Sequence, residues 1–185
     1  MECGAYNGES LSNTLYFERE RGWQGLLIEP NPTNFAEIIS KHRKAFLLNA
    51  CLSPSTNASV LKFTNVPDHP YLSRLDYRYE VRKDAMERKV GEFTAQHQNI
   101  QCFPTYSILA ALDHHIDLFS LDIETSEIDI LKTIPFDKID VDVFLIESCT
   151  NNCSRSKEIQ KLMSPYGYRY LEIPGYESDI VMSKI

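Results

Sequence analysis

The 185-residue sequence predicts an α/β fold in which helices cover both faces of a mostly parallel β-sheet. Short apolar runs alternate with segments of helical periodicity, as expected for strands joined by crossover helices. Several of the apolar runs end in a carboxylate. The last two runs have no helix between them, so they should pair antiparallel at one edge of the sheet. The length suits one domain, and we expect residues 1–185 to form it.

The first elements follow a glycine-rich turn. "MECGAYNGES" places Glu2, Gly4 and Gly8 after a very short strand, and "GESLSNTLYFERERG" then predicts a helix that ends at Gly22. "WQGLLIE" is typical of a buried parallel strand. "NPTNFAEIISKHRK" predicts a helix capped by Asn31, with proline at its first position.

The middle of the chain interrupts this alternation. "AFLLNACLS" predicts a buried strand, and "SVLKFTNV" alternates as a second strand. Residues 67–100 are polar and lack a clear period, so we interpret them as an insertion with some helix around Glu80–Val90. Insertions near strand ends often set specificity, so we expect this one to cover the substrate side of a site.

The alternation resumes in the last third of the chain. "PTYSILAAL" and "SEIDILKTI" predict helices on either side of the strand "IDLFSLDIE", and "VDVFLIES" predicts the next strand. "SRSKEIQKLMSPYG" predicts a helix with Ile159, Leu162 and Met163 inward. "YRYLEI" and "DIVMSK" close the chain as strands joined by a tight Pro-Gly turn.

The charge balance and the hydropathy exclude two classes of partner. The net charge of −7 argues against nucleic-acid binding by phosphate neutralisation. No stretch approaches the roughly 18 apolar residues that span a bilayer, and we find no signal peptide. As it stands, the chain is therefore expected to be cytoplasmic.

The five cysteines leave three readings open. Cys149 and Cys153 are free thiols, a small loop disulfide or metal ligands, and the odd total argues against a complete disulfide framework. No histidine cluster supports a metal site, so no metal ligand is expected. Two sequons, at Asn57 and Asn152, would matter only in a secretory lumen.

Polar residues gather where the predicted strands end, and ligands of open parallel sheets bind there. Carboxylates stand at Glu2, Glu29, Asp122, Glu124 and Glu147, and small residues follow the third strand at Asn49-Ala50-Cys51. This set favours a ligand with hydroxyls and positive charge over a pyrophosphate. The spacing G-x-x-x-G also differs from the dinucleotide pattern G-x-G-x-x-G. S-adenosylmethionine (SAM), with ribose hydroxyls, an ammonium and a sulfonium, fits this description.

Four segments carry a resemblance to a known family: "ECGAYNGESLSNTLYFERERGWQGLLIEPNP", "AFLLNACLS", "IQCFPTYSILAAL" and "FSLDIETSEIDILKTIPFDKIDVDVFLIE". They resemble the FkbM-type SAM-dependent methyltransferase domain, and most nearly its animal branch, which includes the Star-type secretory-pathway proteins of insects. The resemblance covers nearly the whole chain. It implies O-methylation with SAM as donor and a Rossmann-like three-layer sandwich of the class I methyltransferase type.

The resemblance also implies roles for individual residues. Those matching the methionine-binding turn are Glu2, Gly4, Ala5, Asn7 and Gly8. Glu29, followed by Pro30, matches the ribose acceptor, and Asn49, Ala50 and Cys51 border the adenine site. Asp122 and Glu124 match the D-x-E motif, where either could be the general base and Asp122 could also hold the SAM ammonium.

Two departures from the family pattern stand out. The motif usually continues with glycine, where this chain has Thr125, so we expect a narrower pocket or a changed substrate. The family also has an apolar strand ahead of E-C-G-A, for which only Met1 stands here. We therefore expect most of the first strand to be missing and the chain to be an N-terminally truncated form.

Two functions follow as alternatives. The first is a SAM-dependent O-methyltransferase whose acceptor is an unidentified small molecule, glycan or protein. The second is a non-catalytic Star-like domain that acts in trafficking of membrane cargo from the endoplasmic reticulum to the Golgi and endosomes. In that case the domain would lie on the lumenal side, in a parent protein with a membrane anchor.

Overall fold

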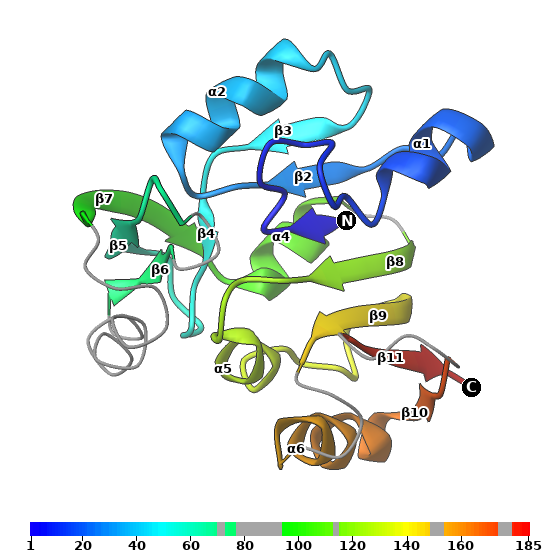
Figure 1. Cartoon of the computed structure of the whole chain (residues 1–185). Coiled ribbons are helices and arrows are strands. Elements are labelled where there is room, and N and C mark those ends of the chain that lie inside the picture. The colour runs from blue at the N-terminus through cyan, green and yellow to red at the C-terminus, as the bar shows by residue number, and fades with distance from the viewer. Residues whose placement is uncertain (70–72, 77–93, 113–114, 149–153, 174–178) are drawn as a thin grey trace.

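The computed structural model describes residues 1–69, 73–76, 94–112, 115–148, 154–173 and 179–185 and contains two β-sheets (Figure 1). The larger sheet has seven strands in the order β10 (Tyr168–Leu171), β11 (Asp179–Lys184), β9 (Val141–Glu147), β8 (Ile116–Leu121), β1 (Glu2–Cys3), β2 (Leu26–Ile28) and β3 (Phe46–Leu48). Neighbours from β9 to β3 pair parallel. β11 pairs antiparallel with both β9 and β10. The predicted α/β fold with a mostly parallel sheet is confirmed.

The shortest strand occupies a central place in this sheet. In β1, Glu2 lies opposite Leu27 on one side and Ser120 on the other. The carbonyl of Met1 also accepts a hydrogen bond from the Ser120 amide at 2.9 Å. The ends of β1, β2 and β8 therefore meet at one edge of the sheet, which is where parallel sheets place their ligands.

The period of two along β2 divides the core between the two faces of the sheet. Leu27 packs with Ile38 of α2 (Pro32–Ser40) on one face. Leu26 and Ile28 belong to the main core on the other face, together with apolar side chains of α4 (Thr105–Leu112) and α5 (Glu127–Leu131). Helices thus cover both faces of this part of the sheet.

The predicted start of α2 is confirmed. The Asn31 side chain accepts a hydrogen bond from the Thr33 amide, and Pro32 opens the helix. The Asn31 side chain also donates to the side-chain oxygen of Asn65, at 2.9 Å. The cap therefore ties α2 to the second sheet.

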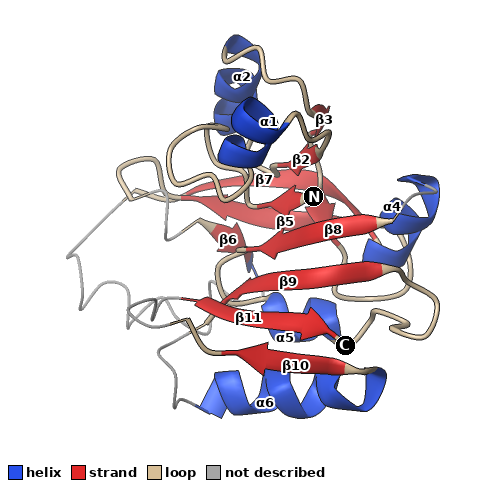
Figure 2. Cartoon of the chain, turned by 90° about the vertical axis from the view of Figure 1, so that its right-hand side faces the viewer, coloured by secondary structure: helices blue, strands red, loops and turns tan. Residues whose placement is uncertain are grey.

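The C-terminal part packs as the periodicity predicts. In α6 (Ser154–Met163), Ile159 and Met163 are fully buried and Leu162 is partly buried against the main core. The helix lies beside β10 and continues into a 3₁₀ turn, η2 (Ser164–Tyr166) (Figure 2). The Tyr168 hydroxyl donates to the Val141 carbonyl at 2.7 Å, which satisfies its polar end inside the core.

The second sheet holds two corrections to the sequence analysis. Its four strands run in the order β4 (Cys51–Leu52), β7 (Gln96–Phe103), β5 (Ser59–Asn65) and β6 (Arg74–Leu75). "AFLLNACLS" is therefore not one strand, because β3 and β4 lie in different sheets and the chain turns between them at Asn49 and Ala50. Residues 96–100 belong to β7; most of their side chains are exposed, so they show no alternation of apolar and polar residues.

The first helix is shorter than predicted. α1 spans Leu15–Arg21 and ends, as expected, at Gly22 in the left-handed conformation. Leu11 lies outside the helix with a φ of 60° and a 96% exposed side chain. The reason is the Glu2 carboxylate, which binds Ser12, Asn13 and Thr14 and holds them out of the helix.

The prediction that β3 is buried is also wrong in part. β3 is an edge strand of the larger sheet, and the Phe46 side chain is 71% exposed. Three other expectations lie outside the described residues, namely the helix around Glu80–Val90, the Pro174–Gly175 turn and the state of Cys149 and Cys153. None of the helices within the described ranges is long and apolar enough to cross a membrane.

A disulfide joins two strands of the second sheet. Cys51 of β4 is bonded to Cys102 of β7, opposite it in the parallel ladder, and Cys3 is buried as a free thiol. Neither cysteine was predicted to form a disulfide. No spacing rule links them, because 51 positions separate them in the sequence.

We expect the Cys51–Cys102 bond to stabilise the second sheet by about 2–4 kcal/mol, because it closes a long loop in the unfolded chain. Reduction with dithiothreitol should lower the melting temperature of the wild-type protein. The control is the double variant Cys51→Ala/Cys102→Ala, whose melting temperature should change much less on reduction. Equal shifts in the two proteins would contradict the prediction and place the effect at another cysteine.

Candidate functional site

A cavity of about 220 Å³ opens where β1, β2 and β8 end. Its walls from the larger sheet include Gly4 to Tyr6, Glu29 and Pro30, and Asp122 to Glu124. The region of the second sheet adds Ala50 to Leu52 with Phe63, Ser73 and Leu75. The loop before α1 adds Ser10, Leu11 and Asn13. Both sheets thus contribute to one site.

Gly4 lets the backbone of the first turn lie against the end of β8. Its φ is 81°, and a Cβ atom there would fall 1.7 Å from the Asp122 carbonyl oxygen. The Gly4 amide donates to the Ile28 carbonyl at 3.0 Å, which holds the turn to β2 as well. A side chain at this position is excluded both by its conformation and by the neighbouring backbone.

Glu2 borders the cavity, but its carboxylate is used by the protein. It accepts hydrogen bonds from the Ser12 hydroxyl at 2.8 Å, the Asn13 amide at 3.0 Å and the Thr14 hydroxyl. The Glu2 residue is 4% exposed. In the described structure its role is to hold the segment between the glycine turn and α1.

Glu29 is a buried carboxylate on the cavity wall, 5% exposed. Its two oxygens accept from the Tyr6 amide and the Asn31 amide, each at 2.9 Å. Burial raises its pKa to about 7, and these hydrogen bonds act in the opposite direction. The group can therefore gain or lose a proton near neutral pH.

Other residues expected at the site lie at different distances from the cavity. Ala5, Pro30, Ala50 and Cys51 line it, whereas Asn7, Gly8 and Asn49 do not. The Asn7 side chain accepts from the Ser10 amide at 2.8 Å, and Asn49 donates to the Glu29 carbonyl at 2.8 Å. Both asparagines shape loops that reach the cavity. Gly8 lies against the side chain of Ile38.

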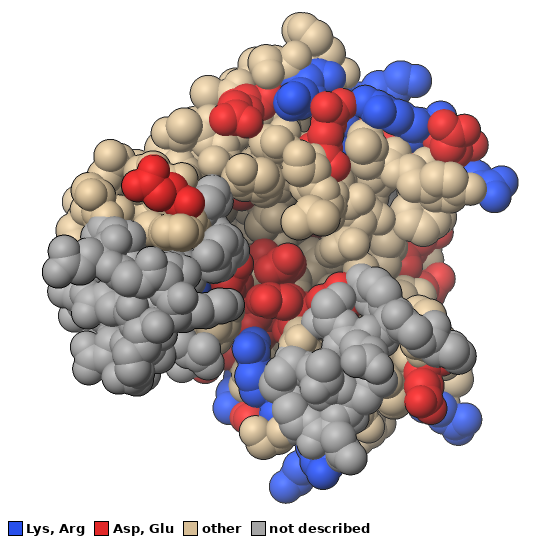
Figure 3. Space-filling view, viewed as in Figure 1, with Lys and Arg blue, Asp and Glu red and all other residues tan. Residues whose placement is uncertain are grey.

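Four carboxylates gather at the end of the site formed by β8, α5 and β9, and Figure 3 shows Asp and Glu side chains in the hollow of this face. Burial is the largest cause of a raised pKa in each of them. The pKa of Asp122 rises to about 6, those of Glu127 and Glu147 to about 7, and that of Glu124 to about 8. Repulsion among the four negative charges acts in the same direction.

Two arginines face this acidic group. Arg74 of β6 lies 3.5 Å from Glu124 and is 4% exposed, and Arg155 of α6 pairs with Glu127. Glu127 also accepts from the amides of Ile123 and Thr125, at 3.0 and 3.1 Å. Glu127 therefore orders the loop that carries Glu124, although the sequence analysis assigned it no role.

Thr125, which stands where the family pattern has glycine, was expected to narrow the pocket or change the substrate, and the loop from Glu124 to Ser126 shows a different effect. Glu124 and Thr125 adopt positive φ values of 56° and 84°, a region that glycine occupies more readily. Thr125 does not line the cavity, so it does not narrow it directly, and its buried hydroxyl has no hydrogen-bond partner among the described residues. The structural consequence of losing glycine is backbone strain beside Asp122.

Several wall residues carried no signal in the sequence. Phe63, Ser73 and Leu75 reach the cavity only because the second sheet folds against the first, and Leu11 was expected in a helix. Ser120 could have been found from its place near the end of β8. Glu147 had been recognised as a strand-end carboxylate, without a role.

Two groups among the described residues are compact enough to hold a metal ion. Asp122, Glu124 and Glu147 each place one carboxylate oxygen within 4.8 Å of the others, and His115, Asp140 and Asp142 form the second group. In the second group, His115 already contacts both aspartates, at 3.0 and 3.1 Å. We assign no metal to either group.

The comparison with known families agrees with this geometry. A family model described as the methyltransferase FkbM domain matches residues 2–170, from the glycine turn to β10. The chain belongs to the FkbM methyltransferase family. No curated protein matches this FkbM chain, so its place in a Star-type branch and its truncation stay predictions.

Replacing Gly4 with alanine in this FkbM domain should lower the free energy of unfolding by about 3 kcal/mol or more, because the Cβ atom would meet the Asp122 carbonyl. Gly22→Ala is the matched control. Gly22 has a similar φ of 69°, but a Cβ atom added there would meet no other atom within 4 Å, so its cost should be only about 1–2 kcal/mol. Urea unfolding measures both; equal losses would contradict the close approach.

Stability should also depend on pH. Between the ordinary carboxyl pKa and the raised values of about 6 to 8, the folded protein binds more protons than the unfolded chain. The contribution of these five groups to stability is therefore fully present below the ordinary pKa and is lost as pH rises through the raised values. We expect the melting temperature to drop by about 5 °C or more between about pH 5 and pH 8.

A neutral substitution within the acidic group should reduce this dependence. Glu124→Gln removes one of the charges that must form in the folded state, so its melting temperature should fall less over the same pH range. Glu158→Gln, on the exposed face of α6 where Glu158 pairs with Lys132, is the control. A melting temperature that rises with pH would contradict the raised pKa values.

Proposed function

We propose that the chain is a SAM-dependent methyltransferase that transfers a methyl group to an oxygen of its acceptor. The observation that carries the proposal is the shared cavity. The Gly4 turn, Glu29 and Asp122 lie on three neighbouring strand ends and border the same space. The strand order and the antiparallel pair at the edge support a Rossmann-like fold of the class I methyltransferase type.

The residues of the cavity suit the parts of SAM. The backbone at Gly4 would approach the methionine part, because glycine has no side chain to stand between the backbone and the ligand, and Ala5 adds only a methyl group. Glu29 would accept the ribose hydroxyls, since each carboxylate oxygen can accept more than one hydrogen bond. Pro30, Ala50 and Cys51 would border the adenine ring.

SAM would supply an activated methyl group on its sulfonium. The contribution of the chain is to hold the two reactants in line, because methyl transfer depends mainly on positioning. The preformed turn at Gly4 and the anchored Glu29 both serve this purpose. Neither has to move to reach the cavity.

Asp122 is the better candidate for the general base. Burial and the neighbouring carboxylates raise the pKa of Asp122 to about 6 and that of Glu124 to about 8, so Asp122 would lose its proton more readily than Glu124. Glu124 would then act as a hydrogen-bond donor or carry part of the acceptor contact. An NMR titration of the carboxyl carbons that finds Asp122 still protonated above about pH 8 would overturn this assignment.

One observation favours the compartment that the second candidate requires, since that candidate is a non-catalytic Star-like domain in the secretory pathway. Disulfides persist in oxidising compartments, and the structure joins Cys51 to Cys102 beside the cavity. A lumenal location on the trafficking route from the endoplasmic reticulum would explain this bond. Binding of SAM distinguishes the two candidates, because a trafficking domain without turnover does not need to bind SAM.

Isothermal titration with SAM tests the proposal. The wild-type protein should bind, and Glu29→Gln should weaken binding by about 10-fold or more, because a charge-assisted hydrogen bond is lost. Glu158→Gln is the control, since Glu158 pairs with Lys132 on the exposed face of α6 and does not line the cavity. Absence of binding by the oxidised wild-type protein at millimolar SAM would sink the enzymatic proposal and favour the trafficking domain.

A further inference from the structure

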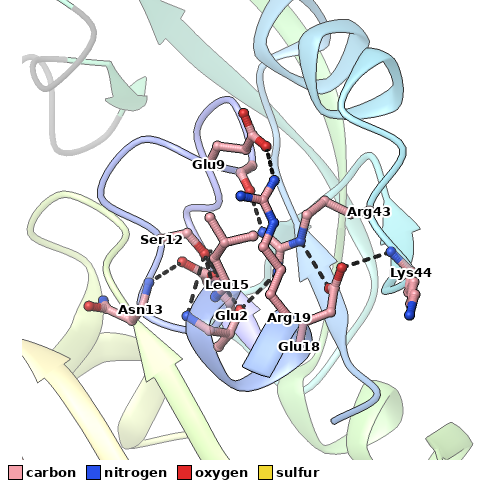
Figure 4. A network of polar contacts seen from close by, with 11 residues as sticks. Glu2, Glu9, Ser12, Asn13, Leu15, Glu18, Arg19, Arg43 and Lys44 are labelled. Atoms are coloured by element: carbon pink, nitrogen blue, oxygen red, sulfur yellow. Dashed lines mark hydrogen bonds and ion pairs between the residues drawn. The ribbon is translucent and has the colours of Figure 1, made fainter. Parts of the chain in front are cut away.

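A buried ion pair lies behind the cavity, between residues that have no role in the proposed reaction. Arg43, between α2 and β3, donates from Nε to the Glu18 carboxylate of α1 at 2.9 Å (Figure 4). The side chains are 2% and 9% exposed. The second oxygen of Glu18 accepts from the Lys44 amide at 2.9 Å. Burying two charges is costly, so the pair needs further contacts to be retained.

The other nitrogens of Arg43 supply those contacts. Nη1 donates to the Gly8 carbonyl and lies 3.4 Å from the Ser12 hydroxyl, and Nη2 lies 3.5 Å from the Thr14 hydroxyl. One planar guanidinium therefore holds three points of residues 8–14, which we call the wall loop. Lysine has no such fork of donors and cannot reproduce all of these contacts.

The wall loop is part of the cavity. Ser10, Leu11 and Asn13 line it, and the Asn13 side chain donates to the Ser120 hydroxyl of β8 at 3.0 Å. The 96% exposed side chain of Leu11 packs on little else. The shape of the wall loop thus depends on the contacts that hold its residues on either side of Leu11.

The same anchor reaches the glycine turn. Ser12 and Thr14, which contact Arg43, also donate to the Glu2 carboxylate, two residues before Gly4. Arg43, the two hydroxyls and Glu2 form one continuous polar network under the wall loop (Figure 4). Loss of the Arg43 guanidinium would therefore loosen both the wall loop and the glycine turn.

We infer that Arg43, paired with Glu18, is a positioning residue for the SAM site. It does not line the cavity. It holds the wall loop in place before the ligand arrives, so binding does not have to order that segment. This inference rests on the proposed function, because it names what the wall loop is held ready for.

The test compares three variants with the wild-type protein: Arg43→Lys, Arg43→Met and Ile159→Ala. Ile159 is fully buried in α6, away from the wall loop, so its truncation destabilises the fold without touching the network. SAM affinity is measured by titration calorimetry well below every melting transition, and amide hydrogen exchange is followed across residues 8–14.

Arg43→Met should weaken SAM binding by about 10- to 100-fold, the range seen when partners that orient metal ligands are removed. Arg43→Lys should fall between Arg43→Met and the wild type, because lysine keeps the charge beside Glu18 but loses the fork. Exchange should accelerate in residues 8–14 of both. Ile159→Ala should lower the melting temperature yet bind SAM within about twofold of the wild type.

Two results would overturn the inference while the proposed function stands. Both Arg43 variants could bind SAM within about twofold of the wild type, or Ile159→Ala could weaken binding as much as they do. The first result removes the positioning role, and the second reduces it to general stability. A wild-type protein that binds no SAM is a different result, because it overturns the proposed function and the inference together. Arg43→Lys keeps the test decisive if Arg43→Met does not fold.

Discussion

The contact between the Gly4 backbone and the Asp122 carbonyl sets the geometry on which the rest of the site depends. A Cβ atom at Gly4 would lie 1.7 Å from that carbonyl oxygen, so β1 and β8 can end side by side only with glycine there. Asp122 is thereby fixed beside the first turn, and the turn is fixed against β2 through the Ile28 carbonyl. The ends of β1, β2 and β8 can form one wall of the cavity because Gly4 has no side chain.

Negative charge is the second organising feature. Burial and mutual repulsion raise the pKa values of Asp122, Glu124, Glu127 and Glu147, and the ion pairs with Arg74 and Arg155 offset this only in part. Such an arrangement costs stability at neutral pH and would be relieved by a positively charged ligand. By the same argument, a sulfonium or ammonium group would suit the cavity better than a phosphate.

The second sheet adds further walls to the site at the end of the parallel sheet. The chain leaves the larger sheet after β3, which ends at Leu48. β4 then pairs with β7, and the Cys51–Cys102 bond links the two strands. Phe63 and Leu75 then face a cavity whose opposite wall comes from β1, β2 and β8. The cavity and the second sheet therefore share Cys51, which lines the cavity and is bonded to Cys102 of β7.

The sequence predicts four features of this protein, because each depends on local periodicity or on one residue's conformational preference. They are the α/β class, the cap at Asn31, the end of α1 at Gly22 and the carboxylates at the strand ends. Periodicity could not predict where "AFLLNACLS" divides, that residues 96–100 form a strand, or that Cys51 meets Cys102. Nor could it predict that the Glu2 carboxylate accepts hydrogen bonds from the Ser12 and Thr14 hydroxyls, or that Arg43 holds the wall loop. These features are contacts between segments that local patterns do not connect. The packing of the two sheets and the burial of charged side chains determined which residues of these segments came into contact.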